Sequence, residues 1–292
     1  MKNTFKKVLL IISFLFSINP LYSLAMPIDI AEGYVKNGDD LINTLTPDEL
    51  FNEFKEASVN NTIKEAISFY NQSMKAAPNY IDSYLKKGCV LYIRHKYKEA
   101  VVSLNKAIEI SPESMNQNVL ISGHSFPVYW LIAQSYFGLK KYDNVVKQFQ
   151  LAGQSNPKNL DNYINELTGM AGQLSLKKQY TYALKICDLA ITKQPNNAAI
   201  YYAKVSAYLG LKQYDNVVKQ FETLGGFQSI DVDYYLTALQ GMARQLVRIK
   251  QYQHALQLYD LALLKKPDDV EIKKARDKAQ TEWGLYKDKG SK

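Results

Sequence analysis

The sequence Tyr142-Asp-Asn-Val-Val-Lys-Gln-Phe149 occurs twice in this chain, and its second copy is Tyr214-Asp-Asn-Val-Val-Lys-Gln-Phe221. The two copies belong to a longer duplication, because residues 126–197 align with residues 198–269 without a gap and about 32 of the 72 paired positions are identical. Self-similarity at a fixed period is typical of repeat proteins, in which each unit buries its apolar face against the next one. The duplication therefore predicts a repeat architecture.

Each duplicated unit divides into two helical hairpins. A short pattern of Lys or Gln, then Tyr, two variable residues and Ala or Val begins at Lys96, Lys141, Gln179, Gln213 and Gln251. A proline stands fifteen residues after four of the five tyrosines, at Pro112, Pro157, Pro195 and Pro267, and Pro78 marks an earlier turn. Proline lacks an N–H group and clashes with the preceding helical turn, so these prolines indicate where hairpins end.

This arrangement resembles the tetratricopeptide repeat, in which two antiparallel helices in about 34 residues carry small, large and aromatic residues at fixed positions before a final proline. Residues 81–114 match the pattern best, through Tyr84, Gly88, Leu91, Ala100, Leu104, Ala107 and Pro112. The resemblance implies an all-α fold, a right-handed superhelical solenoid of tetratricopeptide-like hairpins. The array covers residues 47–269, with repeats at about 47–80, 81–114, 126–159, 164–197, 198–231 and 236–269, of which 47–80 is degenerate.

Residues 1–25 have the features of an export signal. Lys2, Lys6 and Lys7 precede a short apolar run, and Ser23-Leu24-Ala25 supplies small residues before a cleavage site after Ala25. The run is shorter than the roughly 20 apolar residues that a transmembrane helix needs. We therefore expect an exported protein, periplasmic or secreted, without stable membrane insertion after cleavage. An uncleaved membrane anchor is the alternative.

The segments that flank the array have different expected roles. Residues 26–46 show only a weak amphipathic pattern and are expected to form an N-terminal arm, either flexible or a loose cap. Residues 270–292 are expected to form a C-terminal capping helix and tail, because a terminal repeat must cover the last apolar face of the array.

Composition argues against several classes of function. The net charge of +8 includes three lysines of the signal, and the remaining lysines are scattered among acids at helical spacing, so we expect no binding to nucleic acid. His95, His124 and His254 are far apart, and no phosphate-binding loop or nucleophile elbow occurs. We therefore predict no enzyme activity, no metal and no cofactor. Cys89 and Cys187 fall in apolar helical patterns and are expected to be buried and unbridged.

Two insertions interrupt the repeat period. About eleven extra residues lie around Met115–Ser125, and a smaller insertion lies near Leu160–Tyr163. A tolerated surface loop is one interpretation of the longer insertion. The alternative is an enzyme, or an enzyme-regulatory subunit, with a site near residues 115–125, where His124 adjoins Ser125.

The resemblance also implies where a partner would bind, because the first helix of each hairpin lines the concave face of such arrays. Outward residues on these helices are candidate peptide contacts, and packing against the next repeat is their alternative role: Tyr92, Trp130, Gln134, Phe137, Tyr202, Gln240, Arg244 and Arg248. Exposed aromatic side chains are typical anchors in interfaces. The expected function is an exported scaffold or adaptor that binds an extended peptide segment of a protein partner. A secreted factor that acts on a host protein is a further alternative.

Overall fold

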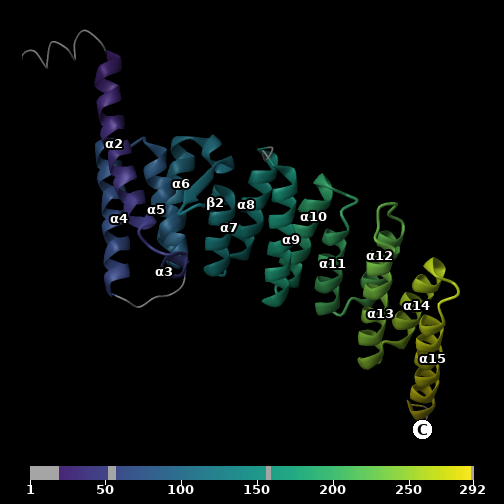
Figure 1. Ribbon diagram of the computed structural model, residues 1–292. Coiled ribbons are helices and arrows are strands. Elements are labelled where there is room, and N and C mark those ends of the chain that lie inside the picture. The colour runs from purple at the N-terminus through teal and green to yellow at the C-terminus, as the bar shows by residue number, and fades with distance from the viewer. Residues whose placement is uncertain (1–19, 52–56, 156–158, 291–292) are drawn as a thin grey trace, which may run out of the picture. The chain divides into compact units, whose positions relative to one another are not determined.

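The computed structural model describes residues 20–51, 57–155 and 159–290 of the chain. Helices dominate these residues (Figure 1), and the chain divides into two compact units, residues 1–158 and 159–292. Successive helices pack as hairpins in each unit, which confirms the predicted all-α repeat solenoid.

The first unit contains seven α-helices and one small sheet among its described residues. Its elements are α2 (Pro20–Asn43), α3 (Pro47–Phe51), α4 (Ala57–Ala76), α5 (Ile81–Ile93), α6 (Tyr97–Ile110), the 3-10 helix η1 (Pro112–Asn116), β1 (Asn118–Ile121), β2 (His124–Pro127), α7 (Val128–Gly138) and α8 (Tyr142–Gln154). Helices α2, α5 and α7 are the first helices of successive hairpins and contact one another in that order. Their hairpin partners α4, α6 and α8 are the second helices.

The N-terminal hairpin differs from the sequence expectation. Helix α2 packs along α4 with Ala31, Val35 and Ile42 buried, so most of residues 26–46 form a structured helix and not a flexible arm. Ser73 Oγ of α4 donates a hydrogen bond to the Ala31 carbonyl oxygen at 2.7 Å. The first helix of this hairpin is therefore α2, and residues 47–51, expected to begin the degenerate repeat, form only the short helix α3. The expected export signal lies mostly in residues 1–19, outside the described residues, and its last residues begin α2.

Close packing within the hairpin at residues 81–114 depends on Gly88. A Cβ atom at this position would lie 2.5 Å from Leu104 Cγ, a distance that real Cβ contacts do not show. Glycine therefore lets α6 approach α5 with Leu104 fully buried between them, as the repeat pattern predicts. Removal of one such leucine from a packed core typically costs about 2–5 kcal/mol.

The turn between the two helices of a hairpin has the same geometry five times in the described residues. One residue in each turn has a left-handed backbone: His95, Lys140, Lys178, Lys212 and Lys250 have φ between 56° and 62°. In the first of these turns, the backbone N–H of Lys96 donates to the Leu91 carbonyl oxygen at 2.8 Å, and that of His95 to Tyr92 at 2.9 Å. These two bonds define a Schellman motif, which ends the first helix. The residue after it, Lys or Gln in the sequence pattern, is the N-cap of the second helix.

The second unit continues the hairpins after residue 158. Its elements are α9 (Leu160–Leu176), α10 (Tyr180–Lys193), α11 (Ala198–Gly210), α12 (Tyr214–Gly225), α13 (Val232–Arg248), α14 (Tyr252–Lys265) and α15 (Val270–Gly290). The small insertion near Leu160–Tyr163 lengthens a helix, since α9 has 17 residues where α11 has 13. Asn159 caps α9 through a bond from the Asn162 N–H at 3.0 Å, and Asp231 caps α13 through Tyr234 at 3.0 Å, so the duplicated helices keep the same start.

The C-terminal helix α15 packs against α14. Ile272 and Ala279 are buried in this contact, whereas Val270, the first residue of the helix, is exposed. Cys89 in the first unit and Cys187 in the second are both buried and free, in agreement with the sequence prediction.

Candidate binding surface

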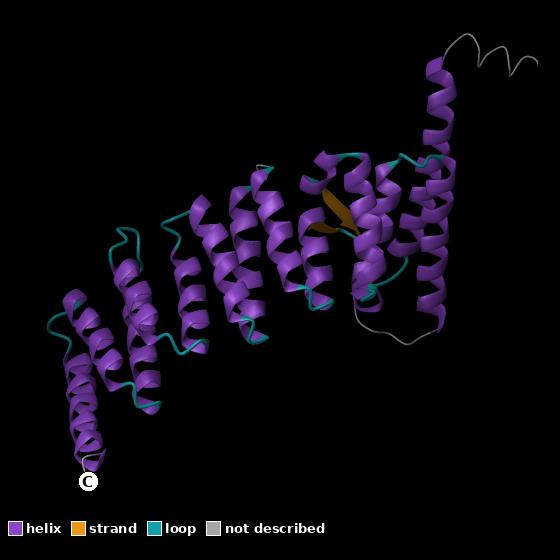
Figure 2. Ribbon diagram, turned by 180° about the vertical axis from the view of Figure 1, so that it is seen from behind, coloured by secondary structure: helices purple, strands orange, loops and turns teal. Residues whose placement is uncertain are grey.

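The long insertion in the first unit folds as a β-hairpin, which the sequence analysis did not predict. Strands β1 and β2, orange in Figure 2, are antiparallel, with Ile121 opposite His124, so only Ser122 and Gly123 form the loop. Both loop residues have positive φ angles, 48° and 77°. Two positive φ angles are the signature of a type I′ turn, whose twist matches that of the two strands. A compact, ordered element therefore replaces the expected loop.

The β-hairpin is attached to the helices by apolar burial on one face. Val119 and Ile121 of β1 are buried in the same core as residues of α2, α4 and α5, while Leu120 between them is exposed. This alternation follows from the two-residue period of a strand. Full burial of each of these two side chains is worth about 1.5–3 kcal/mol.

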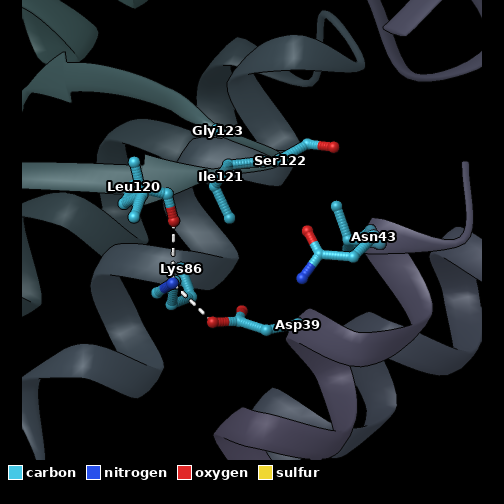
Figure 3. Close-up of a pocket in the computed structure, with 8 residues that line it drawn as sticks. Asp39, Asn43, Lys86, Leu120, Ile121, Ser122 and Gly123 are labelled. Carbon is cyan, nitrogen blue, oxygen red and sulfur yellow. Dashed lines mark hydrogen bonds and ion pairs between the residues drawn. The ribbon is translucent and has the colours of Figure 1, made fainter. Parts of the chain in front are cut away.

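A polar network fixes the same strand to three helices. Lys86 Nζ on α5 donates to the carbonyl oxygen of Leu120 at 2.7 Å and forms an ion pair with Asp39 on α2 (Figure 3). The other carboxylate oxygen of Asp39 accepts a hydrogen bond from the Tyr70 hydroxyl of α4 at 2.8 Å. Burial, followed by the negative charge of Asp39, raises the pKa of Tyr70 far above its usual value. We call Tyr70, Asp39, Lys86 and Leu120 the brace.

A small cavity of about 120 Å³ lies beside the brace. The Asn43 side chain and the Ser122–Gly123 turn border it together with Asp39 and Lys86 (Figure 3). This volume holds a few water molecules, whereas pockets for ordinary ligands measure roughly 300–1,000 Å³. The brace therefore serves to position the β-hairpin and does not form a pocket of substrate size.

His124 and Ser125 do not pair with each other. The Nδ1 atom of His124 lies 3.0 Å from the Ser122 carbonyl oxygen, and Ser125 Oγ accepts a hydrogen bond from the Asn118 amide at 3.0 Å. Successive side chains of a strand point to opposite faces, which accounts for this separation. The nucleophile and base considered from sequence are thus not assembled here. Among the described residues, no group of three or more His, Cys, Asp or Glu side chains could hold a metal ion.

A continuous set of aromatic rings runs from α3 over β2 to α7, α5 and α6. We call it the aromatic belt, and its members are Phe51, Tyr92, His95, Tyr97, His124, Phe126 and Trp130. None of the seven side chains is buried. Ring centroids lie 4.7 Å apart for Phe51 and His124, 6.0 Å for Phe126 and Trp130, and 5.5 Å for Tyr92 and Trp130. Aromatic pairs at these separations stabilise one another by about 0.5–1.5 kcal/mol beyond their burial.

The belt is only partly exposed, because Phe51, Tyr92, Phe126 and Trp130 pack against the core of the unit, and its members restrain one another. Trp130 packs edge to face against Tyr92 and stacks on Phe126, so its ring orientation is set by residues of two other elements. At the end of the belt, His95 Nδ1 lies 2.6 Å from the Tyr97 hydroxyl. Such pre-ordered aromatic surface loses little side-chain entropy when it binds a partner.

Comparison with known proteins identifies the hairpin that carries part of this surface. The family model described as "Tetratricopeptide repeat" matches residues 81–114, which comprise α5 and α6 with the connecting turn. Residues 81–114 therefore form a tetratricopeptide repeat. No curated protein matches its sequence significantly.

Solved structures with similar chains include MamA and YrrB. MamA is 17% identical, the match covers 65% of this chain and 90% of that chain, and the TM-score is 0.43. YrrB, described as a TPR protein with an unusual peptide-binding site, is 15% identical, with 71% of this chain and 97% of that chain covered and a TM-score of 0.38. TTC0263, a thermophilic TPR protein in Thermus thermophilus, is 15% identical. The match covers 69% of this chain and 99% of that chain, with a TM-score of 0.30.

The candidate contacts of the tetratricopeptide array that lie in the first unit have different environments. Tyr92 and Trp130 belong to the aromatic belt and are partly exposed. Phe137 is half-buried, with its ring centroid 6.0 Å from that of Tyr142. Gln134 was a candidate either for an outward contact or for packing, and only 8% of it is exposed, so the outward position is wrong and its side chain is packed.

The predicted peptide contacts in the second unit are three polar residues on α13 and one tyrosine on α11. Arg244 and Arg248 are exposed one helical turn apart on α13, and Gln240 precedes them by one turn and is partly buried. Tyr202 packs against Phe221 and Tyr234, and its hydroxyl is enclosed without a hydrogen-bond partner among the described residues. Burial, with Tyr234 and Asp231 nearby, raises the pKa of Tyr202 to about 12. The Tyr202 ring is thus held largely by its own unit.

Sequence reasoning missed five of the seven belt residues: Phe51, His95, Tyr97, His124 and Phe126. Phe126 and His124 alternate along β2, a spacing that indicates a strand, but a four-residue strand gives too short a pattern to recognise beside long helices. Phe51 lies in α3, which was assigned to a degenerate repeat.

No helix among the described residues combines the length and hydropathy that a membrane span requires.

Proposed function

We propose that this tetratricopeptide-repeat protein is an exported scaffold that binds an extended segment of a protein partner through the aromatic belt. The tetratricopeptide fold supports a role in protein–protein interaction. The observation that carries the finer proposal is the belt itself, in which seven partly or fully exposed rings form one connected surface over five elements. Exposed, well-packed Trp and Tyr side chains are the residue types that dominate interface energies.

An extended peptide fits this surface better than a small ligand. No belt residue lines the adjoining cavity of about 120 Å³, which holds only a few water molecules. Alternate side chains of an extended segment point to the same side at intervals of about 7 Å, a little more than the 4.7–6.3 Å between neighbouring ring centroids of the belt. Apolar or aromatic residues at alternate positions of the partner would therefore contact successive rings.

The amino-terminal sequence supports the export part of the proposal. Its positive start, short apolar run and Ser23-Leu24-Ala25 are typical of a cleaved signal. N-terminal sequencing of the protein from its own cells should find Met26 as the first residue, in a periplasmic or secreted fraction. An intact Met1 in a membrane fraction would contradict export by a cleaved signal.

The binding part is tested by affinity capture with paired variants. The chain without residues 1–25 is immobilised and exposed to a cell-envelope extract, and captured proteins are identified by mass spectrometry. A Tyr92→Ala/Trp130→Ala double variant should lose the captured partner. Phe69→Ala is the matched control, since Phe69 is a partly exposed aromatic residue of α4 that lies outside the belt and should leave capture unchanged. Equal capture by the double variant and the parent chain would exclude the belt as the binding surface.

A further inference from the structure

The second helices of the first unit form a groove that is separate from the aromatic belt. It lies between α4 and α6 with α5 at its base, and its volume is about 780 Å³. None of the seven belt residues lines it. Its base and walls include Ile67 and Met74 of α4 and the buried Leu91 of α5. The groove thus offers apolar surface that the proposed function does not use, and the two sites approach each other at Lys96, which lies between the belt residues His95 and Tyr97.

One face of α6 gives this groove a specific chemical pattern. Lys98, Val102 and Lys106 follow one another at intervals of four residues and all line the groove. Residues four apart lie on the same side of a helix, so the pattern is a stripe of cation, apolar side chain and cation. Val102 is 67% exposed, so its apolar side chain is open to solvent between the two lysines. The two lysines are about 12 Å apart along the helix axis.

The charge of the groove is strongly one-sided. Five lysines and two glutamates line it, and one glutamate, Glu109, already pairs with Lys106. Lys64 adds a cation from α4, so positive charge borders the apolar base on both sides. Surfaces with an apolar centre and a rim of one charge favour ligands with the complementary arrangement.

Lys87 is a partly buried cation inside the groove. Its Nζ atom donates to the side-chain oxygen of Asn71 at 2.8 Å, a neutral acceptor. Partial burial lowers the pKa of Lys87, because desolvation disfavours its charged form. A carboxylate brought into the groove would stabilise this cation.

We propose that the groove between α4 and α6 binds an acidic amphipathic helix of a partner protein. A Glu or Asp at position i, an apolar residue at i+4 and a second acid at i+8 of that helix would face Lys98, Val102 and Lys106. This is the helix-in-groove mode of recognition, in which apolar anchors give affinity and the charged rim gives orientation. The site is distinct from the belt, so the protein has two independent surfaces for two segments.

The test uses a fluorescent 20-residue helical peptide with the sequence pattern Glu-x3-Leu-x3-Glu, titrated with the full chain in an anisotropy assay. Lys98→Glu/Lys106→Glu should weaken binding at least tenfold, and Val102→Asp should do the same. Lys147→Glu on α8 reverses an exposed lysine outside the groove and should leave affinity unchanged. A peptide with Lys in place of Glu should not bind. An increase of salt from 50 to 300 mM should lower the affinity of the chain for the acidic peptide, because salt screens the charges.

Two results would overturn the proposal. One is an affinity for the acidic peptide that the double charge reversal does not change. The other is binding of the chain to vesicles of anionic lipid, lost in the double variant, with no binding of the peptide. Trp130→Ala separates this inference from the proposed function, because it should abolish capture at the belt and leave affinity for the acidic peptide unchanged.

Discussion

Lys86 joins two segments that are 34 residues apart, because its Nζ atom donates to the carbonyl oxygen of Leu120 at 2.7 Å. The same ammonium group pairs with Asp39, whose side chain is 25% exposed, so the contact is partly screened from water. One lysine thus connects α2, α5 and the inserted β-hairpin. Since Phe126 and His124 of the aromatic belt lie on this β-hairpin, the brace also positions the proposed binding surface.

Replacement of Lys86 by Met should destabilise the first unit by about 1–2 kcal/mol. The loss is smaller than the 3–5 kcal/mol typical of a fully buried broken pair, because both partners retain some exposure to water. Hydrogen exchange of the β1 and β2 amides should accelerate more than that of α8. Lys106→Met is the control, since the exposed Lys106–Glu109 pair should contribute no measurable stability. Unchanged exchange in the β-hairpin of the Lys86 variant would contradict the role of the brace.

The loop of the β-hairpin should become more stable when Ser122 is replaced by Gly. Ser122 has a φ angle of 48°, which costs a residue with a Cβ atom roughly 1 kcal/mol relative to glycine. We expect a gain of about 0.5–1 kcal/mol in the free energy of unfolding. Gly123→Ala should lower the free energy of unfolding, because it places a Cβ atom at a φ angle of 77°. This Cβ atom would meet no other atom within 4 Å, so the variant measures backbone strain alone. Chemical denaturation of both variants checks the two signs.

The hairpin turns offer a second set of stabilising changes. Lys140 and Lys250 hold the left-handed position of Schellman motifs, where glycine is preferred. Lys140→Gly and Lys250→Gly should each stabilise their own unit by about 0.5–1 kcal/mol. Lys140→Ala is the matched control, because it removes the same side chain but keeps a Cβ atom at the positive φ angle, so it should bring no comparable gain. An equal gain from Lys140→Ala and Lys140→Gly would contradict the backbone explanation.

Much of this architecture is predictable from sequence because residues of the same type recur at fixed positions of each repeat. Gly88 and Leu104, the Tyr that begins each second helix, and the prolines after the hairpins all occupy the sites that the tetratricopeptide pattern requires. Helix α2 was not assigned to the array because its buried residues, such as Ala31 and Val35, carry no repeat signature beside the export signal. The aromatic belt depends on contacts between β2, α3 and α7, and sequence spacing alone does not bring Phe51 near His124.

The buried Cys187 thiol and Tyr235 hydroxyl of the second unit predict a loss of stability at alkaline pH. Burial raises the pKa of the Cys187 thiol to about 12 and that of Tyr235 to about 12 from ordinary values of 9.0 and 10.0. Because the folded state keeps these protons longer than the unfolded state, stability is complete below about pH 9 and falls as pH rises toward 12. Thermal melts across this range should show the decline, and Cys187→Ala should reduce its slope near pH 9–10. A melting temperature independent of pH from 8 to 11 would contradict the assignment.

Free, buried thiols also predict the response to alkylation. At pH 8 the folded chain should react slowly with iodoacetamide, since the thiolate is the reactive form and burial raises the pKa of both Cys89 and Cys187. After unfolding, intact mass spectrometry should find two alkylated cysteines per chain in protein purified without reductant. A mass two hydrogens below that of the reduced chain would show a disulfide and disprove the prediction.

The account depends most on whether Trp130 anchors a partner or holds the repeats together. Trp130 is partly exposed and contacts Tyr92 and Phe126. The decisive measurement is isothermal titration of the captured partner segment against Trp130→Ala, paired with a thermal melt of the same variant. We predict that binding weakens by at least about 2 kcal/mol, the size of an interface hot spot, while unfolding loses about 1–3 kcal/mol, the contribution of the two ring pairs of Trp130. Unchanged affinity together with a destabilisation of about 3–5 kcal/mol, the usual cost of truncating a buried aromatic residue, would contradict the proposal.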